Sequence, residues 1–292
     1  MMLARRYAYR VIGLLVLLAF VAFFAVPMLW LLLAPTKTDF QLANQSPFSF
    51  GSLGRWVHTF NHVINYQGQL MLGWLKNSAI YSGGGTALAL LAAIPAGYGL
   101  ALTQFIGRRA LLGITLVVMI MPATALVMPL FLEAAAVHLV GTVWSVILPF
   151  AFFPFGTYLA YIYFSSSIPK DLLAAARIDG AGEWGVFRHV ALPLARPIVA
   201  LVAFFAFVAD WTNYYLPFVM ASQSGTPVTV GLQLLVSASP RFSPTAAGFA
   251  GSEIFGPDLA MATLIAALPI LIIFLFAQRM LVKGMLAGAT KG

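Results

Sequence analysis

The chain contains no cysteine among its 292 residues, and it carries few charges. The absence of cysteine excludes disulfides, thiolate metal sites and a cysteine nucleophile. Only 8% of the residues are charged and 61% are hydrophobic, a balance outside the range of soluble globular domains. A water-facing domain of this length could not bury so much apolar surface. The composition therefore indicates that the chain lies in lipid.

Acidic residues are scarcer than basic ones, with 8 Asp and Glu against 16 Lys and Arg, and the net charge is +8. A positive charge can indicate nucleic-acid binding, but that reading needs a basic stripe on a folded surface. Membrane topology explains the same charges better, so we expect membrane lipid as a partner and no nucleic acid.

The sequence also lacks the motifs of common catalytic sites. It has no Gly-x-x-x-x-Gly-Lys-Ser/Thr loop, so it cannot cradle the phosphates of ATP. The four histidines, His58, His62, His138 and His189, are dispersed, and the i, i+4 pair His58 and His62 has no third metal ligand nearby. No Ser/His/Asp grouping can be assembled on one side of a membrane. We expect no catalysis, no metal and no cofactor in this chain.

Six apolar, charge-poor segments are each long enough to cross about 30 Å of hydrocarbon at about 1.5 Å per residue. They cover residues 11–34, 77–104, 110–132, 143–164, 198–220 and 259–278. The first is too long for the core of a signal peptide, so we expect it to remain as a peripheral first helix. The sequence predicts an all-α polytopic membrane protein that forms a single transmembrane domain over residues 1–292, with core helices within about 77–278.

The distribution of basic residues predicts the topology. With the N-terminus inside, only Lys37, Arg55, Lys76 and Arg241 lie outside, which leaves 12 of the 16 basic residues inside. The inverted arrangement would leave four inside, against the positive-inside rule. Both termini are therefore predicted to be cytoplasmic. The aromatic residues of the outer segment 35–76, which are Trp56, Tyr66 and Trp74, favour positions at the membrane interface.

The segment 168–197 is the only long charged stretch between apolar segments. Pro169 suits the first turn of a helix, Gly180 allows a turn, Glu183 suits the start of a second helix, and Pro193 ends the pattern. Two short amphipathic helices with a glycine turn cannot cross a bilayer. We expect them to lie beneath it and to bind a soluble partner.

The same segment carries a family pattern. The residues Ala174, Ala175, Ala176, Gly180, Val190, Leu192 and Pro193 have the spacing of Glu-Ala-Ala, three residues, Gly, nine residues, then Ile-x-Leu-Pro. In this respect the chain resembles the permease subunits of binding-protein-dependent ABC importers. The tail 283–292 is similar to the ending of the second-permease type of carbohydrate importers. The Glu of the family pattern is Ala174 here, so a carboxylate that pairs with a basic ATPase residue in relatives is absent.

The resemblance implies a type I importer permease with a cytoplasmic coupling helix between helices 4 and 5, which moves a sugar by alternating access. It implies a heterodimer with a second permease, two cytoplasmic ATPase subunits that hold ATP and Mg²⁺, and an extracytoplasmic solute-binding protein. The residues implied to contact the ATPase are Leu172, Leu173, Ala174, Ala175, Ala176, Asp179, Gly180, Glu183, Phe187 and Pro193, with Gly288 and Lys291 in the tail. Since Ala174 removes the ion pair, we expect docking through Leu172, Leu173, Ile178 and the glycine turn.

Asp210 is the only acid clearly inside an apolar segment. Because a carboxylate in hydrocarbon is costly, it should face protein or water. It could accept hydrogen bonds from sugar hydroxyls together with Trp211, Asn213, Tyr214 and Tyr215, or it could serve as a structural partner to a neighbouring helix. The aromatic residues could equally form an interfacial belt.

A rival function is a carrier or channel for a small polar solute that works alone. Such a carrier would need an ion-coupling cluster inside its helices or an inverted repeat, and neither is evident in the sequence. A purely structural membrane protein would leave the charged segment 168–197 without a role.

The absence of a phosphate-binding loop gives a first prediction. The purified chain, reconstituted alone in lipid, should show no ATP hydrolysis above the rate of empty vesicles. Phosphate release is the measurement, and a preparation with its ATPase partners is the positive control. Turnover by the isolated, contaminant-free chain would contradict the prediction.

Overall fold

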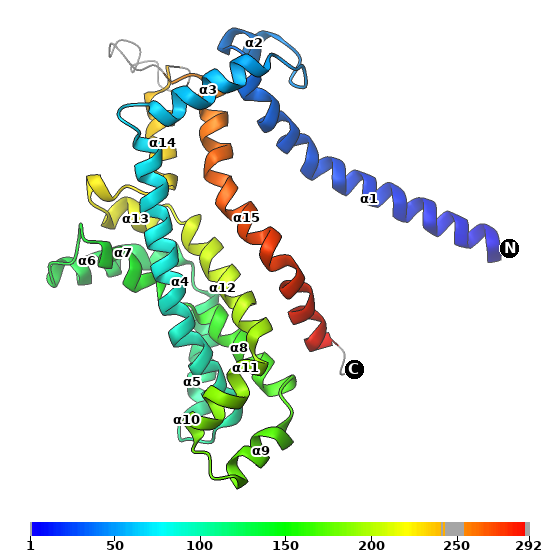
Figure 1. The fold of residues 1–292 in the computed structure, drawn as a ribbon, viewed down its shortest axis with the longest axis vertical. Helices are drawn as coiled ribbons and strands as arrows, with labels where there is room; N and C mark the ends of the chain where they lie inside the picture. The colour runs from blue at the N-terminus through cyan, green and yellow to red at the C-terminus, as the bar shows by residue number, and fades with distance from the viewer. Residues whose placement is uncertain (1, 241, 243–253, 290–292) are drawn as a thin grey trace. The chain divides into compact units, whose positions relative to one another are not determined.

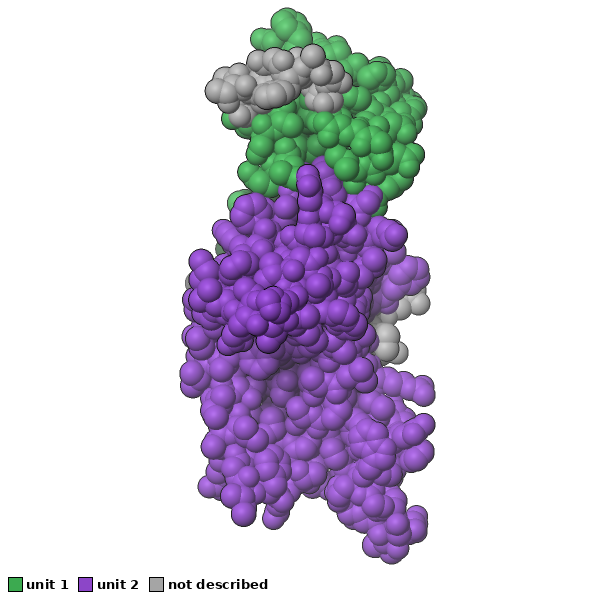
Figure 2. Space-filling model, turned by 90° about the vertical axis from the view of Figure 1, so that its left-hand side faces the viewer, with its two compact units in different colours: residues 1–72, 232–267 green, residues 73–231, 268–292 purple. Residues whose placement is uncertain are grey.

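The computed structural model describes residues 2–240, 242 and 254–289, and these residues form helices with no β-strand among them (Figure 1). Contacts divide the chain into two compact units. Residues 1–72 and 232–267 form the first unit, and residues 73–231 and 268–292 form the second (Figure 2). The expectation of a single domain over residues 1–292 stays a prediction.

The first unit begins with a long apolar helix and continues with short polar ones. Its complete elements are α1 (Met2–Leu33), the 3₁₀ helix η1 (Ala34–Thr36), α2 (Asp39–Asn44) and α3 (Leu53–Asn65). The unit also contains parts of three helices that continue beyond it, which are α4 (Leu70–Leu102), α14 (Val228–Ala238) and α15 (Gly256–Ala289).

Buried polar contacts stabilise the first unit. Lys37 is completely buried, and its Nζ donates hydrogen bonds to the carbonyl oxygens of Ser46 and Pro47 at 2.9 and 3.0 Å. A buried ammonium group is costly unless its donors are satisfied, and these carbonyl groups satisfy two of them. His62 Nδ1 lies 3.0 Å from Asp258 Oδ1, which links α3 to the first turn of α15.

The second unit holds most of α4 and all of the elements between α4 and α14. These are α5 (Arg108–Ile120), η2 (Ala123–Leu126), α6 (Val127–Ala136), α7 (Val143–Phe150), α8 (Pro154–Ser166), α9 (Lys170–Ile178), α10 (Glu183–Val186), the π-helix η3 (Phe187–Ala191), α11 (Leu192–Leu194), α12 (Arg196–Trp211), α13 (Tyr215–Met220) and η4 (Gln223–Gly225).

The apolar helices agree with a polytopic membrane protein. Four stretches are long and apolar enough to cross a membrane, namely Arg10–Thr36, Leu70–Leu102, Val143–Ser166 and Gly256–Gln278. The number reaches six if each of two sharply bent helix pairs counts as one span. The prediction of an all-helical membrane protein is therefore confirmed, and the upper count equals the six predicted spans.

The third predicted span, 110–132, is not one helix. α5 ends at Ile120, and the chain bends by 100° before η2 and α6. Pro122 lies in the break, and Met121 before it is extended. A proline has no backbone N–H, and its ring disfavours helical geometry in the preceding residue, so the break follows from the sequence at this position.

The fifth predicted span, 198–220, is also interrupted, because α12 ends before Thr212. The hydroxyl group of Thr212 donates to the carbonyl oxygen of Val208 at 2.7 Å, and Asn213 Oδ1 accepts the N–H of Leu216 at 3.2 Å. Side chains that bond nearby backbone groups compete with the helix, and Asn213 here satisfies a backbone N–H at the start of α13.

Two further expectations need correction, while the span predicted over 143–164 is present as Val143–Ser166, with a short irregular stretch between α7 and α8. α4 begins at Leu70 rather than at residue 77. Tyr66 and Trp74 are buried within the chain, so only Trp56 of the three aromatic residues is exposed as an interface residue would be.

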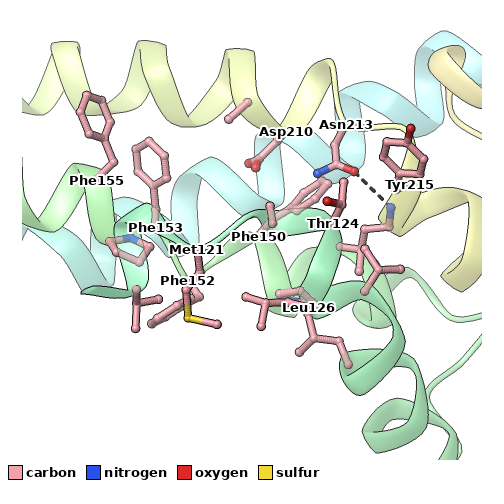
Figure 3. A pocket seen from close by; sticks show the side chains of 18 of the residues that line it. Met121, Thr124, Leu126, Phe150, Phe152, Phe153, Phe155, Asp210, Asn213 and Tyr215 are labelled. Carbon is pink, nitrogen blue, oxygen red and sulfur yellow. Dashed lines mark hydrogen bonds between the residues drawn. The ribbon is translucent and has the colours of Figure 1, made fainter. Parts of the chain in front are cut away.

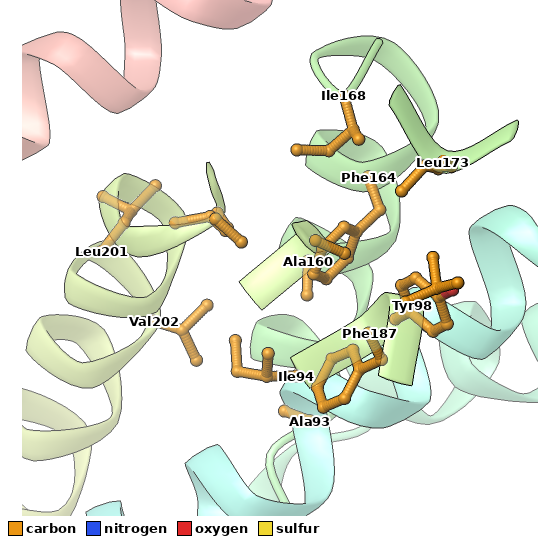
Figure 4. Packing of buried hydrophobic residues seen from close by; sticks show 14 residues of the cluster. Ala93, Ile94, Tyr98, Ala160, Phe164, Ile168, Leu173, Phe187, Leu201 and Val202 are labelled. Atoms are coloured by element: carbon orange, nitrogen blue, oxygen red, sulfur yellow. The ribbon is translucent and has the colours of Figure 1, made fainter. Parts of the chain in front are cut away.

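The largest buried cluster of the second unit joins α4, α8 and α12 to the charged segment (Figure 4). The ring of Tyr98 lies 5.5 Å from that of Phe164 and 5.0 Å from that of Phe187, measured between centroids. Gly97 lies where a Cβ atom would collide with Ala160 of α8. Small residues at such a contact let two membrane helices approach closely, so α4 and α8 form a rigid pair.

Candidate functional site

The charged segment 168–197 folds into helices joined by a glycine turn. α9 and α10 lie on either side of the turn, and Gly180 has a φ angle of +88°. This left-handed conformation is costly for residues that carry a Cβ atom, whereas glycine adopts it readily. The predicted turn at Gly180 is confirmed, as is the position of Glu183 at the start of the second helix.

Pro193 does not end the second helix, contrary to expectation. It lies inside α11, and the chain turns by 78° only between α11 and α12, around Ala195. The N–H of Leu192 bonds to the carbonyl oxygen of Phe187, five residues earlier. This wider π turn comes directly before the proline, which has no N–H to continue a regular ladder.

The inner face of the segment is built into the core. Leu173, Val186 and Phe187 are each at most 5% exposed and belong to the same buried cluster as Tyr98 and Phe164. Leu173 and Phe187, two of the residues expected to contact a partner, therefore face the interior of the chain. Their burial connects the segment mechanically to α4 and α8.

The outer face of the segment presents large apolar side chains. Leu172 is 48% exposed, Ile178 is 85% exposed and Trp184 is 67% exposed. Among the remaining predicted contact residues, Ala176 is half-buried. The others are exposed, and they are Ala174, Ala175, Asp179, Gly180, Glu183 and Pro193. The sequence analysis missed Trp184, although its place in the first turn, two residues before buried Val186, could have indicated an outward position.

An ion pair closes the glycine turn. The Arg177 Nε and Nη2 atoms donate to Glu183 Oε1 and Oε2 at 2.8 and 3.2 Å, and the hydroxyl group of Tyr98 donates to Oε2 at 3.2 Å. The hydrogen bonds from Arg177 lower the pKa of Glu183, and the same bonds raise the pKa of Arg177. The pair fixes α9 to α10, and Tyr98 fixes both to α4.

A second candidate site is a cavity of about 510 Å³ in the second unit (Figure 3). Asp210, Asn213, Tyr214 and Tyr215 all line it, so the structure brings together four of the five residues predicted for a substrate path. Trp211 does not line it; this residue is buried, and its ring stacks on that of Phe207 at 5.4 Å.

Three helix breaks meet at this cavity. Its lining includes Met121 from the bend after α5, Phe152 and Phe153 between α7 and α8, and Thr212 and Asn213 after α12. Irregular backbone at membrane depth is tolerated where it lines a cavity inside protein. The phenylalanine residues of the lining were not predicted, although the prolines at 122, 149 and 154 could have indicated the breaks.

Asp210 is the one acidic residue among the described residues that line the cavity. Its Oδ2 atom is buried and has no hydrogen-bond partner among the described residues. Gly85 of α4 makes room for it, because a Cβ atom there would lie 2.6 Å from Oδ2 and 2.6 Å from Phe150 Cβ. The described residues that line the cavity include no Lys, Arg or His. A buried carboxylate oxygen without a partner favours a ligand that donates hydrogen bonds.

The two predicted tail positions are only partly covered by the structure. The backbone at Gly288 belongs to α15, whereas Lys291 lies outside the described residues. The dispersed histidines form no metal site with three ligands in the part of the chain that the structure describes.

The family of the chain follows from comparison with known proteins. Residues 85–287 match the family described as "Binding-protein-dependent transport system inner membrane component". The chain belongs to this family. It is therefore a membrane-embedded permease component of a transport system and not an enzyme.

The permease is similar to several curated proteins along nearly its whole length. It is 29% identical to the maltodextrin transport system permease protein MdxG of Bacillus subtilis, over 94% of each chain. It is 31% identical to the arabinooligosaccharides transport system permease protein AraQ of Halalkalibacterium halodurans, over 94% of each chain. It is 31% identical to the trehalose transport system permease protein SugB of Mycobacterium tuberculosis, over 93% of this chain and 94% of the relative.

A solved structure shares the fold of the permease. A chain of a bacterial ABC transporter involved in the import of the acidic polysaccharide alginate matches with a TM-score of 0.78, covering 94% of this chain and 96% of that one. The two sequences are 19% identical. At this identity the likeness shows the fold alone.

The ion pair at the glycine turn gives a second prediction. Arg177→Ala and Glu183→Gln should each destabilise the permease slightly, and the double variant should reveal a coupling free energy of about 0.5 kcal/mol at pH 7, as expected for an exposed pair. The pKa of Glu183 is lowered on folding. The stability that the ionised carboxylate adds to the folded permease is therefore fully present above the unfolded-state pKa, and it is lost as the pH falls through the folded-state pKa.

The coupling energy is measured from unfolding of the purified permease in mixed detergent, at neutral pH and at a pH below the lowered folded-state pKa of Glu183. Arg188→Ala combined with Glu183→Gln is the matched control, because Arg188 forms no ion pair among the described residues. Coupling that persists when the carboxylate is protonated would contradict an electrostatic origin.

Proposed function

We propose that the permease moves a sugar or sugar oligomer into the cytoplasm, as the transmembrane subunit of an ATP-driven importer. The similar curated proteins are permeases for maltodextrin, arabinooligosaccharides and trehalose, all of which are carbohydrates. The observation that carries the proposal is the charged segment, which has one face in the core and the other exposed. A segment that transmits movement from a soluble ATPase to the membrane helices needs both an exposed face for the ATPase and a buried face against the helices.

The proposed assembly contains a second permease, two ATPase subunits that hold ATP and Mg²⁺, and a solute-binding protein that delivers the sugar. Both termini and the charged segment face the cytoplasm in this proposal, which is the orientation favoured by the basic residues. The exposed side chains of Leu172, Ile178 and Trp184 then form an apolar docking surface for the ATPase. Ala174 contributes no charge to it, so contact area rather than an ion pair holds the partner.

The buried cluster explains how a movement of the segment would reach the membrane. Leu173 and Phe187 pack against α4 and α8, and the same cluster includes Val202 of α12. From Val202, α12 continues for eight residues to Asp210 at the cavity, which is about 12 Å at the rise of an α-helix. When ATP closes the ATPase dimer, the segment, α4, α8 and α12 move as one body. The cavity then opens to the other side of the membrane by alternating access.

The cavity suits a neutral, hydroxyl-bearing ligand. The carboxylate of Asp210 would accept hydrogen bonds from sugar hydroxyls, and Asn213 and Tyr215 add further polar groups. The rings of Phe150, Phe152 and their neighbours provide flat apolar faces against which a sugar ring can pack. Since the described lining contains no basic residue, an anionic sugar would find no counter-ion there.

The glycine turn gives the third prediction, which tests the coupling role. Gly180→Asp places a side chain and a charge on the exposed turn at a φ angle of +88°, and the added Cβ meets no atom of the permease itself within 4 Å. The membrane fold should therefore remain. Transport should fall by about tenfold or more, a loss of at least ~1.4 kcal/mol, because the turn no longer fits the ATPase.

Gly182→Asp is the matched control for this variant. Gly182 is the N-cap of α10 with a φ angle of −68°, where aspartate is a favoured residue. It adds the same charge two positions away without backbone strain. Uptake, ATP hydrolysis and co-purification of the ATPase are measured for both variants. If Gly180→Asp imports as well as the control, the segment is not the coupling element.

Asp210 gives the fourth prediction. Replacing a carboxylate that bonds to the sugar should weaken transport, with Asp210→Ala losing more than Asp210→Asn, because the amide oxygen still accepts a hydrogen bond. A bond to a charged group contributes about 1.5–3 kcal/mol, so the loss for alanine should reach about tenfold in kcat/KM for uptake.

Glu133→Gln is the control for the change from carboxylate to amide, since Glu133 is exposed and lies outside the cavity. The thermal stability of each variant separates a transport role from a structural one. A variant Asp210→Ala that is as stable as wild type and imports normally would exclude Asp210 from the substrate path.

A further inference from the structure

Helix α3 has three separate faces. Leu53, Val57, Phe60 and Ile64 follow one another at the spacing of a single helical stripe, and the first three are 73%, 52% and 37% exposed. Thr59 and Val63 lie on a second face and are buried against the rest of the first unit. The third face is polar and carries His58, Asn61 and Asn65. α3 therefore exposes an apolar stripe next to a polar face that also reaches the surface.

The position of α3 relative to α1 is fixed by hydrogen bonds. The backbone N–H of Ser52 donates to the carbonyl oxygen of Thr36 at 2.8 Å, and that of Gly51 donates to the Thr36 hydroxyl group at 3.0 Å. The hydroxyl group of Thr59 donates to the carbonyl oxygen of Pro35 at 3.1 Å. A side chain at Gly51 would collide with the Thr36 carbonyl group. α3 is thus held directly against η1, the end of α1 (Figure 1).

The end of α1 is where a membrane span leaves the hydrocarbon. The stretch Arg10–Thr36 is the most apolar candidate span, and none of its most apolar part is buried inside the described chain. Trp30 lies shortly before its end, and Trp56 stacks on Phe60 in α3 with ring centroids 5.9 Å apart. Tryptophan prefers the boundary between acyl chains and headgroups. The fixed contact with η1 therefore places α3 at the level of that boundary.

We propose that α3 is an interfacial helix that lies in the lipid surface at this end of α1. Its stripe of Leu53, Val57, Phe60 and Ile64 enters the boundary between acyl chains and headgroups, and its polar face remains in water. An uncharged stripe beside a polar face, on a helix that is hydrogen-bonded to the end of α1, is the pattern of a helix bound to a membrane surface. The helix would fix the depth and tilt of α1, because the two are bonded together.

The absence of cysteine makes a direct test possible. Single cysteines at 57, 60 and 64 on the stripe and at 58, 61 and 65 on the polar face each receive a nitroxide spin label. The full-length permease is purified with the subunits that accompany it and reconstituted in vesicles of phosphatidylethanolamine and phosphatidylglycerol. Collision with oxygen, which concentrates in lipid, and with a water-soluble nickel chelate is then measured for each label. The wild-type chain, which has no cysteine, gives the background from the other subunits.

The proposal expects oxygen collisions to dominate at 57, 60 and 64 and nickel collisions to dominate at 58, 61 and 65, with a period of about 3.6 residues. Low collision with both reagents along the stripe would show that protein covers it, such as a second permease or a solute-binding protein, and would overturn the proposal. High nickel collision on every face would show a helix in water and would overturn it as well. Label positions 57 and 64 preserve the test if the change at Phe60 disturbs folding.

Discussion

The structure depends on the requirement that backbone polar groups at membrane depth find partners within the protein. A helix meets this requirement along its length, and each interruption of a helix exposes groups that need another environment. In the second unit, the interruptions after α5, between α7 and α8, and after α12 all line one cavity. Three of the helix interruptions therefore meet at a single place, where a polar ligand could bond to the released backbone groups.

Coupling of ATP hydrolysis to movement at the cavity would require a mechanical connection between the cavity and the surface where an ATPase would bind. The buried cluster supplies this connection. The charged segment contributes Leu173, Val186 and Phe187 to the same packed body as α4, α8 and α12. Close-packed interiors transmit displacement and do not absorb it. The ion pair of Arg177 and Glu183 stiffens the turn outside this body. The exposed apolar side chains of Leu172, Ile178 and Trp184 are consequently carried by helices whose inner face is fixed in the core.

Much of this fold could be predicted from the sequence, because apolar length and the glycine turn are local signals. The spans, the charged segment and the left-handed Gly180 depend on residues close together in the chain. The breaks near Pro122 and Asn213 were missed because hydropathy depends only on how apolar the residues are. It does not change when a proline or a capping side chain interrupts the backbone hydrogen bonds of the helix. The inward direction of Leu173 and the bond from Tyr98 to Glu183 were also missed. They arise from residues of α4 and the segment that only the tertiary fold brings together.

Gly85 has a consequence for how this permease can change over evolutionary time. The space that its missing side chain leaves is occupied by Asp210 Oδ2 and by Phe150. The three positions therefore share one fixed volume and cannot vary independently. A homologue with alanine or serine at the position of Gly85 must carry a smaller residue at one of the other two, or separate α4 from α12. Correlated replacement at 85, 150 and 210 would thus record changes in the size and polarity of the cavity as the family diversified.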